Sequence, residues 1–191
     1  LKEYRLILSS ASPRRQNFFK AMGFDFKLDV RPVDEVYSNK LKRAEITNYL
    51  AALKAKPFDD LQPNDILITS DTIVWFKDKP IEKAANRQEA INMLKELSGN
   101  YHEVITSVCF TTTATQKLVA DTVKVWFDVL SDEQIAYYID KYEPYDKAGS
   151  YGIQEWLGYV GVPKIEGSFF TVMGLPTHLV YKALDQMTHE G

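Results

Sequence analysis

The sequence has little cysteine: its one residue, Cys109, stands in an apolar run that is typical of a strand. A single cysteine excludes a disulfide framework within the chain, which suits a reducing compartment. We therefore expect Cys109 to lie in the core and the protein to be cytoplasmic.

Long apolar runs are also missing, since none approaches the roughly 20 residues of a membrane-spanning helix. The start, Leu1-Lys2-Glu3-Tyr4, does not show the pattern of a signal peptide. We expect no membrane partner.

An excess of basic residues is missing as well: 23 lysines and arginines face 26 acidic residues, for a net charge of −3. A broad nucleic-acid surface usually needs a basic excess, so we expect no nucleic-acid partner and only local anion sites. There is no P-loop, HExxH, GxSxG or CxxC motif, and the histidines have no metal-ligand spacing.

The 191 residues, 45% of them hydrophobic, suffice for one large domain or two small lobes. Apolar and capping patterns predict strands and helices that alternate in the first half of the chain, which favours α/β architecture. Residues 101–129 predict a long two-stranded ribbon, in which Val123, Val125, Phe127 and Val129 share one face. We expect a mixed, elongated sheet flanked by helices, in one domain (1–191) with two lobes and a central cleft.

The other expected elements are a strand at 4–9, helices at 13–22, 46–53, 87–97, 132–142 and 176–187, and two apolar runs at 66–68 and 73–76. Residues 146–174 are glycine-rich with short apolar pieces.

The segment Ser9-Ser10-Ala11-Ser12-Pro13-Arg14-Arg15 is the strongest local signal, because it joins an apolar strand to a helix. Ser12 suits the N-cap and Pro13 the first helical position. The free N–H groups and dipole of a helix start attract anions, and arginine forks match phosphate oxygens. The segment predicts a phosphate site, with a capped helix bearing two solvated arginines as the alternative.

Asp71 lies between two apolar runs, in Thr69-Ser70-Asp71-Thr72. A carboxylate in such a frame is costly unless it is paired or bound to metal. One interpretation of Asp71 is a metal ligand or general base at a strand end that faces a cleft. The alternative is a turn residue or the partner of a buried lysine.

The segment Asp146-Lys147-Ala148-Gly149-Ser150-Tyr151-Gly152-Ile153-Gln154 has two glycines that let the backbone approach a ligand. Lys147 adds a charge, and the Gln154 amide can contact a base edge; the alternative is a tight, solvated loop.

Together these residues favour a phosphate chemistry. Cationic side chains can hold phosphates (Arg14, Arg15, Lys54 and Lys83), and Glu35 and Asp71 offer oxygen ligands for Mg²⁺. No side chain stands out as a covalent nucleophile with its own base, so attack by water is the simplest proposal.

The chain resembles the Maf family of nucleoside triphosphate pyrophosphatases over nearly its whole length. The matching pieces occur in the family's order: Ser10 to Arg15, Asp34-Glu35, Lys54-Ala55, Asp71-Thr72, Glu82-Lys83, Leu97-Ser98-Gly99 with His102, Asp146 to Gln154, and Gly167-Ser168 followed by Val172 to Pro176.

The resemblance implies an α/β fold related to inosine-triphosphate pyrophosphatase and hydrolysis of a nucleoside triphosphate to the monophosphate and pyrophosphate. It implies a divalent cation, Mg²⁺ or Mn²⁺, held by Glu35 and Asp71. Asp71 would accept the proton and Glu35 would assist with metal or water. Phosphates would be held by Ser10, Ser12, Arg14, Lys54 and Lys83. Family members often form dimers, so a homodimer is one state that the resemblance allows.

The family's branches differ at three positions. The branch acting on dTTP and UTP has a second arginine, an Asp-Thr pair and a glutamine ending the glycine loop, matched here by Arg15, Thr72 and Gln154. The resemblance therefore favours dTTP, UTP and modified pyrimidine nucleotides. A Gln154 amide can pair with the O/N–H edge of thymine or uracil.

The chain departs from the family in two places: Ala84 follows Lys83 where proline is usual, and Glu155-Trp156 follows Gln154 where glycine is usual. The second change puts a bulky, acidic continuation beside the expected base pocket. Two alternatives to the dTTP/UTP enzyme are a 7-methyl-GTP pyrophosphatase of the same family and a nucleotide-binding regulator of cell division, or septum formation, with little catalysis.

Overall fold

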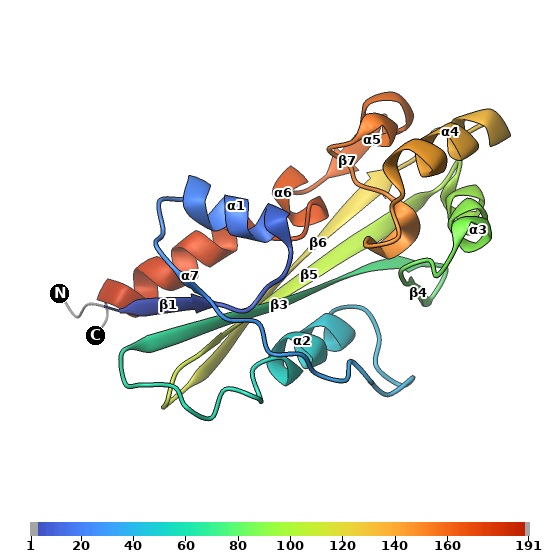
Figure 1. The fold of residues 1–191 in the computed structure, drawn as a ribbon. Helices are drawn as coiled ribbons and strands as arrows, with labels where there is room; N and C mark the ends of the chain where they lie inside the picture. Colours follow the sequence, from blue (N-terminus) through green and yellow to red (C-terminus); the bar gives the residue numbers. More distant parts are fainter. Residues whose placement is uncertain (1–3, 190–191) are drawn as a thin grey trace. The chain divides into compact units, whose positions relative to one another are not determined.

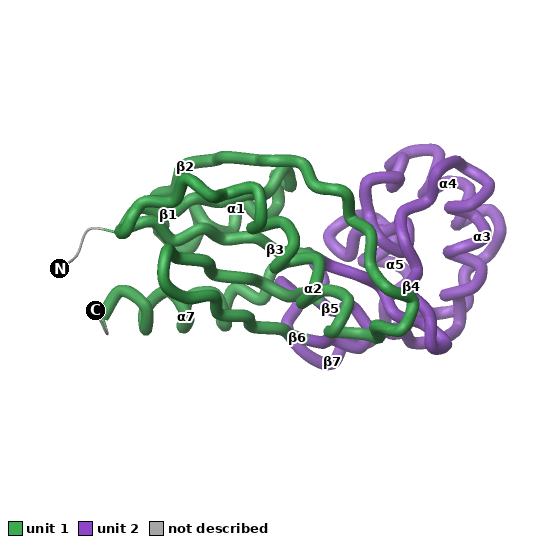
Figure 2. The backbone as a smooth tube through the Cα atoms, turned by 90° about the horizontal axis from the view of Figure 1, so that it is seen from below, with its two compact units in different colours: residues 1–71, 106–121, 174–191 green, residues 72–105, 122–173 purple. Residues whose placement is uncertain are grey.

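The computed structural model describes residues 4–189 and divides into two compact units, which are coloured in Figure 2. Within the described part, the first unit comprises residues 4–71, 106–121 and 174–189, and the second comprises residues 72–105 and 122–173. The long strands therefore contribute residues to both units.

The first unit, green in Figure 2, includes the first strand and the last helix of the described residues, which Figure 1 labels β1 and α7. Its elements include β1 (Arg5–Leu8), α1 (Pro13–Ala21), β2 (Lys27–Leu28), α2 (Ala44–Leu53), the first part of β3 (Asp65–Phe76) and α7 (Thr177–His189), together with the strand residues within 106–121. Strand β1 pairs in parallel with both β2 and β3. Helices α1 and α7 cover one face of these strands and α2 covers the other.

The alternation of side chains along β3 explains these two layers. Ile66 and Ile68 are buried in a cluster with residues of α1 and α7, including Phe19 and Val180. Leu67 points the other way and packs with Ala55 and other residues that follow α2. Both faces of β3 are thus covered, which explains why residues 66–68 and 73–76 are apolar without interruption.

The second unit contains β4 (Lys79–Ile81), α3 (Arg87–Leu97), α4 (Asp132–Tyr142), the 3₁₀ turn η1 (Ala148–Ser150), α5 (Trp156–Gly161), β7 (Lys164–Glu166) and α6 (Phe169–Val172). Parts of β3, β5 (Tyr101–Thr111) and β6 (Gln116–Trp126) complete it. Its core is a cluster that includes Leu94, Ile135, Tyr138 and Leu157.

The strands hydrogen-bond in the order β2-β1-β3-β5-β6-β7, with β4 paired to β3. The β1 pairs are parallel, whereas β3–β4 and β6–β7 are antiparallel. The expected mixed sheet flanked by helices is therefore confirmed. Cys109 is buried in β5, as predicted.

Three details differ from the sequence-based expectation. Residues 65–76 form one strand rather than two runs around a polar break, because the polar residues at 69–71 are buried and stay in the ladder. Val129 is 83% exposed, because β6 ends at Trp126 and its alternation stops there. The short elements α5, β7 and α6 lie in the glycine-rich stretch, where no periodic pattern predicted them.

No helix among residues 4–189 combines the length and the apolarity that crossing a membrane requires.

Candidate functional site

The segment predicted to bind an anion is the turn after β1 and the start of α1. Ser12 is the N-cap of α1, where its hydroxyl accepts the Arg15 N–H at 3.5 Å, and Pro13 occupies the first turn. The Ser10 hydroxyl accepts a hydrogen bond from the Ser12 N–H at 3.3 Å, and the Ser10 backbone carbonyl accepts one from the Gln16 side-chain amide at 3.0 Å. The predicted capped start of α1 is confirmed, and it presents the positive end of the helix dipole.

The strand register brings this turn beside the polar part of β3. Leu8 pairs with Ile68, and the Ser9 N–H donates to the Ile68 carbonyl at 2.9 Å. The turn that follows Leu8 therefore begins beside residues 69–71 of β3, at the carboxyl end of β1, where ligands bind in open α/β sheets.

The two arginines have different surroundings. The Arg15 Nε donates to the Gly174 carbonyl at 2.7 Å, and burial lowers the pKa of the guanidinium while Asp71 raises it. Arg14, one residue earlier, is half-buried on the same first turn of α1. No local signal in the sequence could have predicted the Arg15–Gly174 bond, since 159 residues separate the partners.

Lys54, Glu35 and Asp71 come together as the centre of the site. The Lys54 Nζ lies 2.7 Å from Asp71 Oδ1 and 3.2 Å from Glu35 Oε1, and it also donates to the Ser70 carbonyl at 3.4 Å. Asp71 is 7% exposed, whereas the Glu35 side chain is half exposed. A single ammonium thus pairs with a buried carboxylate and with a second carboxylate that faces water, which leaves one net negative charge among the three side chains.

Burial is the dominant influence on the pKa of Asp71 and raises it, while Lys54 and Arg15 act in the opposite direction and Glu35 adds to the rise. A raised pKa strengthens a carboxylate as a proton acceptor. The buried carboxylate suits a general base, and its ion pair with Lys54 also fits the alternative of Asp71 as the partner of a buried lysine.

Helix α2 is fixed to the sheet by buried hydrogen bonds just before Lys54, its C-cap. Thr69 donates to the Ala51 carbonyl at 2.6 Å, and Thr47 and Ser107 share a hydrogen bond of 2.6 Å. Thr69 and Asp71 lie on the same side of β3. The hydrogen bond from Thr69 therefore fixes the position of α2 along the strand that carries Asp71.

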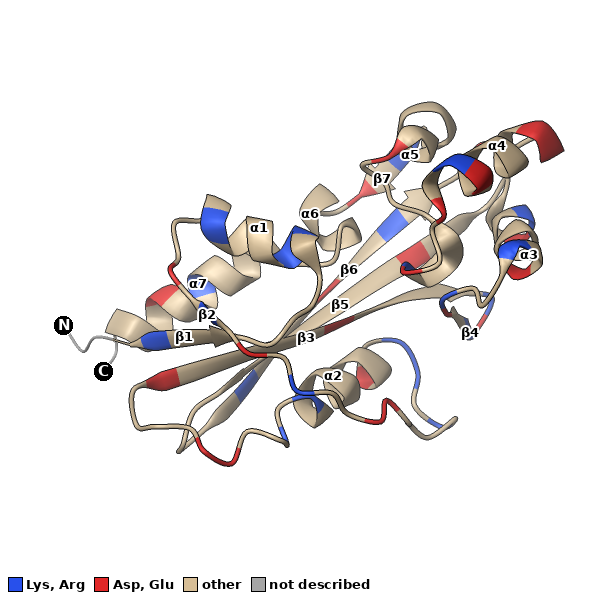
Figure 3. Ribbon diagram, in the orientation of Figure 1, with Lys and Arg blue, Asp and Glu red and all other residues tan. Residues whose placement is uncertain are grey.

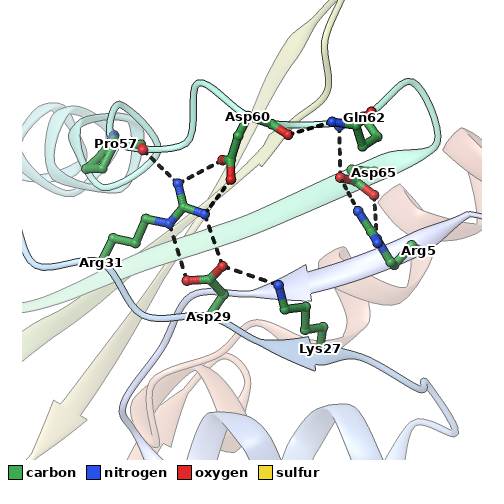
Figure 4. Close-up of polar contacts among 8 residues, drawn as sticks. All are labelled: Arg5, Lys27, Asp29, Arg31, Pro57, Asp60, Gln62 and Asp65. Atoms are coloured by element: carbon green, nitrogen blue, oxygen red, sulfur yellow. Dashed lines mark hydrogen bonds and ion pairs between the residues drawn. The ribbon is translucent and has the colours of Figure 1, made fainter.

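The segment that carries Glu35 has no regular structure, and Arg31 ties it to the chain after α2 (Figure 4). The Arg31 guanidinium bonds to Asp60 at 2.8 and 2.9 Å, to Asp29 at 3.2 and 3.3 Å, and to the Pro57 carbonyl at 2.9 Å. It also lies 4.2 Å from the centre of the Phe58 ring. We call Arg31, Asp29 and Asp60 the Arg31 clamp.

The remaining predicted residues, Thr72, Lys83, Lys147 and Gln154, belong to the second unit. Lys83 is exposed after β4, and the Gly149 N–H donates to the carbonyl of its neighbour Glu82 at 3.1 Å. That bond brings the glycine loop beside Lys83. Thr72 and Gln154 are half-buried.

Lys147 is more enclosed than the sequence suggested. Its side chain is 11% exposed, and its Nζ lies 2.9 Å from Asp146 and 3.2 Å from Glu155. Glu155 was visible in the sequence only as a departure from the family pattern.

Charged residues of both signs are interspersed along the backbone (Figure 3). Among the described residues, no group of three or more His, Cys, Asp or Glu side chains is arranged to hold a metal ion. Glu35 and Asp71 nevertheless place two carboxylate oxygens around the same ammonium group, that of Lys54. Two such carboxylates fit Mg²⁺, which binds one or two carboxylates and completes its coordination shell with phosphates and water.

Comparison with known proteins gives a family match across almost the whole chain: the model for "Maf-like protein" matches residues 5–187. Several curated relatives are named dTTP/UTP pyrophosphatase. The one from Flavobacterium johnsoniae is 54% identical over 96% of this chain and 95% of its own length. The relatives in Christiangramia forsetii and Bacteroides thetaiotaomicron match at 52% and 47% identity, each over 98% of this chain and over 96% and 98% of their own length.

Among solved structures, that of the Staphylococcus aureus Ham1 protein covers 64% of this chain and 71% of its own at 15% identity, with a TM-score of 0.46. The relation to the inosine-triphosphate pyrophosphatase architecture therefore stays a prediction.

Proposed function

Since this chain belongs to the Maf family, we propose that it hydrolyses nucleoside triphosphates, with a preference for dTTP and UTP, to the monophosphate and pyrophosphate. The observation that carries the proposal is the buried Asp71 carboxylate paired with Lys54 beside Glu35. The names of the relatives, at identities of 47–54%, support the same reaction.

In this reaction Asp71 accepts the proton of the attacking water. Its raised pKa favours proton uptake, and Lys54 holds the carboxylate in one orientation. Lys54, Arg14, Ser10 and Ser12 hold phosphate oxygens, together with the N–H groups at the start of α1.

A divalent cation, Mg²⁺ or Mn²⁺, is part of the proposal. Glu35 and Asp71 would hold it, and the cation would neutralise phosphate charge and lower the pKa of a bound water. The ammonium of Lys54 already lies between the two carboxylates, so Lys54 shares their charge with the cation.

We assign five further residues to the nucleotide, Thr72 from the resemblance alone and the others also from their charge or hydrogen-bonding groups: Lys83, Lys147, Arg15 and Gln154. Lys83 would hold phosphates and Lys147 would add a positive charge. Arg15, Thr72 and Gln154 would select the base. We further propose that residues 1–191 act as one Maf-like domain in the cytoplasm, with a homodimer as one assembled state that the resemblance allows.

A substrate panel tests the proposed reaction. The protein is incubated with Mg²⁺ and with dTTP, UTP, dCTP or 7-methyl-GTP, and pyrophosphate and monophosphate are quantified. We expect the highest kcat/KM for dTTP and UTP. A much higher value for 7-methyl-GTP would place the chain in the other branch, and nucleotide binding without turnover would favour the regulator of cell division.

A further inference from the structure

Glu155, which no part of the proposed reaction uses, is the centre of a polar network in the second unit. One carboxylate oxygen lies 3.2 Å from the Lys147 Nζ, and the other accepts a short hydrogen bond from the Tyr138 hydroxyl. The Glu155 side chain is 19% exposed and Tyr138 is fully buried. A carboxylate so enclosed, with both oxygens bonded, is held in one orientation.

Tyr138 extends the network to the backbone of the glycine loop. Its hydroxyl donates to Glu155 and accepts the Gly152 N–H at 2.9 Å. Burial, followed by the bond to Glu155, raises the pKa of Tyr138, so the phenol stays protonated and remains the donor. Helix α4, which carries Tyr138, is thereby connected to the loop through a single side-chain oxygen.

Three side chains converge over Gly152. A Cβ atom at that position would lie 3.1 Å from Glu155 Cδ, 3.1 Å from Lys147 Cε and 3.2 Å from Gln154 Nε2. A side chain at Gly152 would therefore meet Lys147, Gln154 and Glu155 at once, so glycine leaves these three side chains their places around one backbone position. The Gln154 amide thus lies in the immediate surroundings of the Lys147–Glu155 ion pair.

We infer that Glu155 is a positioning residue for base selection: by holding Lys147 and, through Tyr138, the backbone at Gly152, it fixes the Gln154 amide in the orientation that distinguishes thymine and uracil from cytosine. The inference rests on the proposed function. It deepens that function, because it assigns base selection to a residue that the family resemblance does not include.

The chemistry of the pyrimidine edges makes the inference specific. Thymine and uracil present a carbonyl acceptor beside an N–H donor, while cytosine presents an amino donor beside a ring-nitrogen acceptor. A fixed amide can match only one of these orders in a given orientation, and a freely rotating amide can match both. Loosening the network should therefore reduce discrimination more than catalysis.

The test compares kcat/KM for dTTP and dCTP in wild type, Glu155→Gln and Tyr138→Phe. Glu155→Gln keeps an acceptor for Tyr138 but loses the ion pair with Lys147. Tyr138→Phe keeps that ion pair but loses the hydroxyl that bonds to Glu155 and to the Gly152 N–H. We expect the dTTP/dCTP preference to fall about tenfold in each variant, mainly through the KM for dTTP. In the double variant the losses should be less than additive, because both act through one loop.

Asp140→Asn is the matched control. Asp140 is also a carboxylate of the second unit in a two-bond contact, with Arg87 at 2.6 and 2.9 Å, but this pair is exposed and joins α3 to α4. Its substitution should leave the dTTP/dCTP preference unchanged. Thermal unfolding of each variant shows whether it is folded.

A second measurement separates failure of the inference from failure of the proposed function. The affinities for the non-hydrolysable α,β-imido analogues of dTTP and dCTP are measured by calorimetry in wild type and Glu155→Gln. An inactive wild type overturns the proposed reaction, yet the ratio of the two affinities still tests Glu155. A preference that stays within twofold of wild type in folded Glu155→Gln, by activity or by binding, overturns the inference.

Discussion

At the scale of single residues, the paired charges of Asp71 and Lys54 predict a distinctive pH profile. A base must be ionised, so activity falls as pH drops through the pKa of Asp71, which burial raises above its usual value. Lys54 opposes that rise. In a plot of kcat/KM against pH, we expect the acidic limb to lie above the range of an ordinary aspartate.

Lys54→Met should move this acidic limb to still higher pH, besides lowering activity, because the opposing cation is gone. Lys56→Met, which replaces an exposed lysine two residues away, is the control. An acidic limb that does not move in Lys54→Met would mean that another group controls the profile.

Arg14 carries a second prediction at this scale. If its guanidinium binds a phosphate oxygen, Arg14→Ala loses a charge-assisted bond worth roughly 1.5–3 kcal/mol, which is a fall of about 10- to 150-fold in kcat/KM for dTTP. Arg14→Lys should recover part of the loss, since it restores charge without the fork. Unchanged kinetics in Arg14→Ala would show that the side chain faces solvent.

At the scale of elements, two serine caps allow stability to be separated from function. Ser12 caps α1 and Ser131 caps α4 in a capping box with Gln134. Replacement of either serine by alanine should lower the free energy of unfolding by about 1 kcal/mol. Only Ser12→Ala should also reduce kcat/KM for dTTP, because phosphate binding is assigned to the start of α1 and not to the start of α4.

Chemical denaturation and steady-state kinetics on Ser12→Ala and Ser131→Ala check this pair. Equal losses of activity in both variants would indicate that the helix starts contribute through stability alone.

The Arg31 clamp predicts a change in metal dependence. It fixes the segment that carries Glu35 to the chain after α2 (Figure 4). Arg31→Ala should therefore raise the Mg²⁺ concentration for half-maximal activity by about tenfold, the scale seen when groups that orient metal ligands are removed. Magnesium titration of activity measures this.

Arg5→Ala is the control for the clamp. Arg5 also makes a two-bond contact to a carboxylate, Asp65, at 2.7 and 2.9 Å, but it joins β1 to the start of β3. The same shift of the magnesium dependence in both variants would contradict a specific role of the clamp.

The elements themselves were largely predictable, because most carry a strong periodic or capping signal. Asn86, Ser12 and Ser131 mark helix starts that the structure confirms. The short elements α5, β7 and α6 were not predictable, since pieces of three to six residues hold too little pattern and depend on tertiary contacts. The position of Asp71 within a continuous strand also depends on tertiary contacts, because the ion pair with Lys54 and the nearby charge of Arg15 offset the cost of burying the carboxylate.

At the scale of the whole molecule, His102 links stability to pH. It is buried against Phe127 and Tyr151, its Nε2 shares a hydrogen bond of 2.6 Å with the Tyr151 hydroxyl, and its Nδ1 has no partner in the described structure. Burial lowers the pKa of His102 from 6.5 to about 3. Between these values the unfolded chain binds a proton that the folded chain does not, so stability falls as pH decreases from 6.5 towards 3.

His102→Gln removes the titrating group, so denaturation midpoints should fall less steeply below pH 6.5 than in wild type. The difference in slope is at most about 1.4 kcal/mol per pH unit. Identical slopes would mean that His102 is protonated in the folded state.

The assembly of the site was only partly predictable from the sequence. Glu35, Lys54 and Asp71 were chosen by residue type and resemblance, but their common geometry depends on the β1–β3 register and on the docking of α2. The enclosure of Lys147 by Glu155 depends on a contact that no spacing rule gives.

The most direct test of the central claim is pyrophosphate release from dTTP in the presence of Mg²⁺ by wild type and by Asp71→Asn. Asparagine keeps the size of the side chain but cannot accept the proton. The account predicts release of dTMP and pyrophosphate in equal amounts by wild type and a loss of at least about 100-fold in Asp71→Asn, with dTTP still bound. Full activity in folded Asp71→Asn would contradict the account.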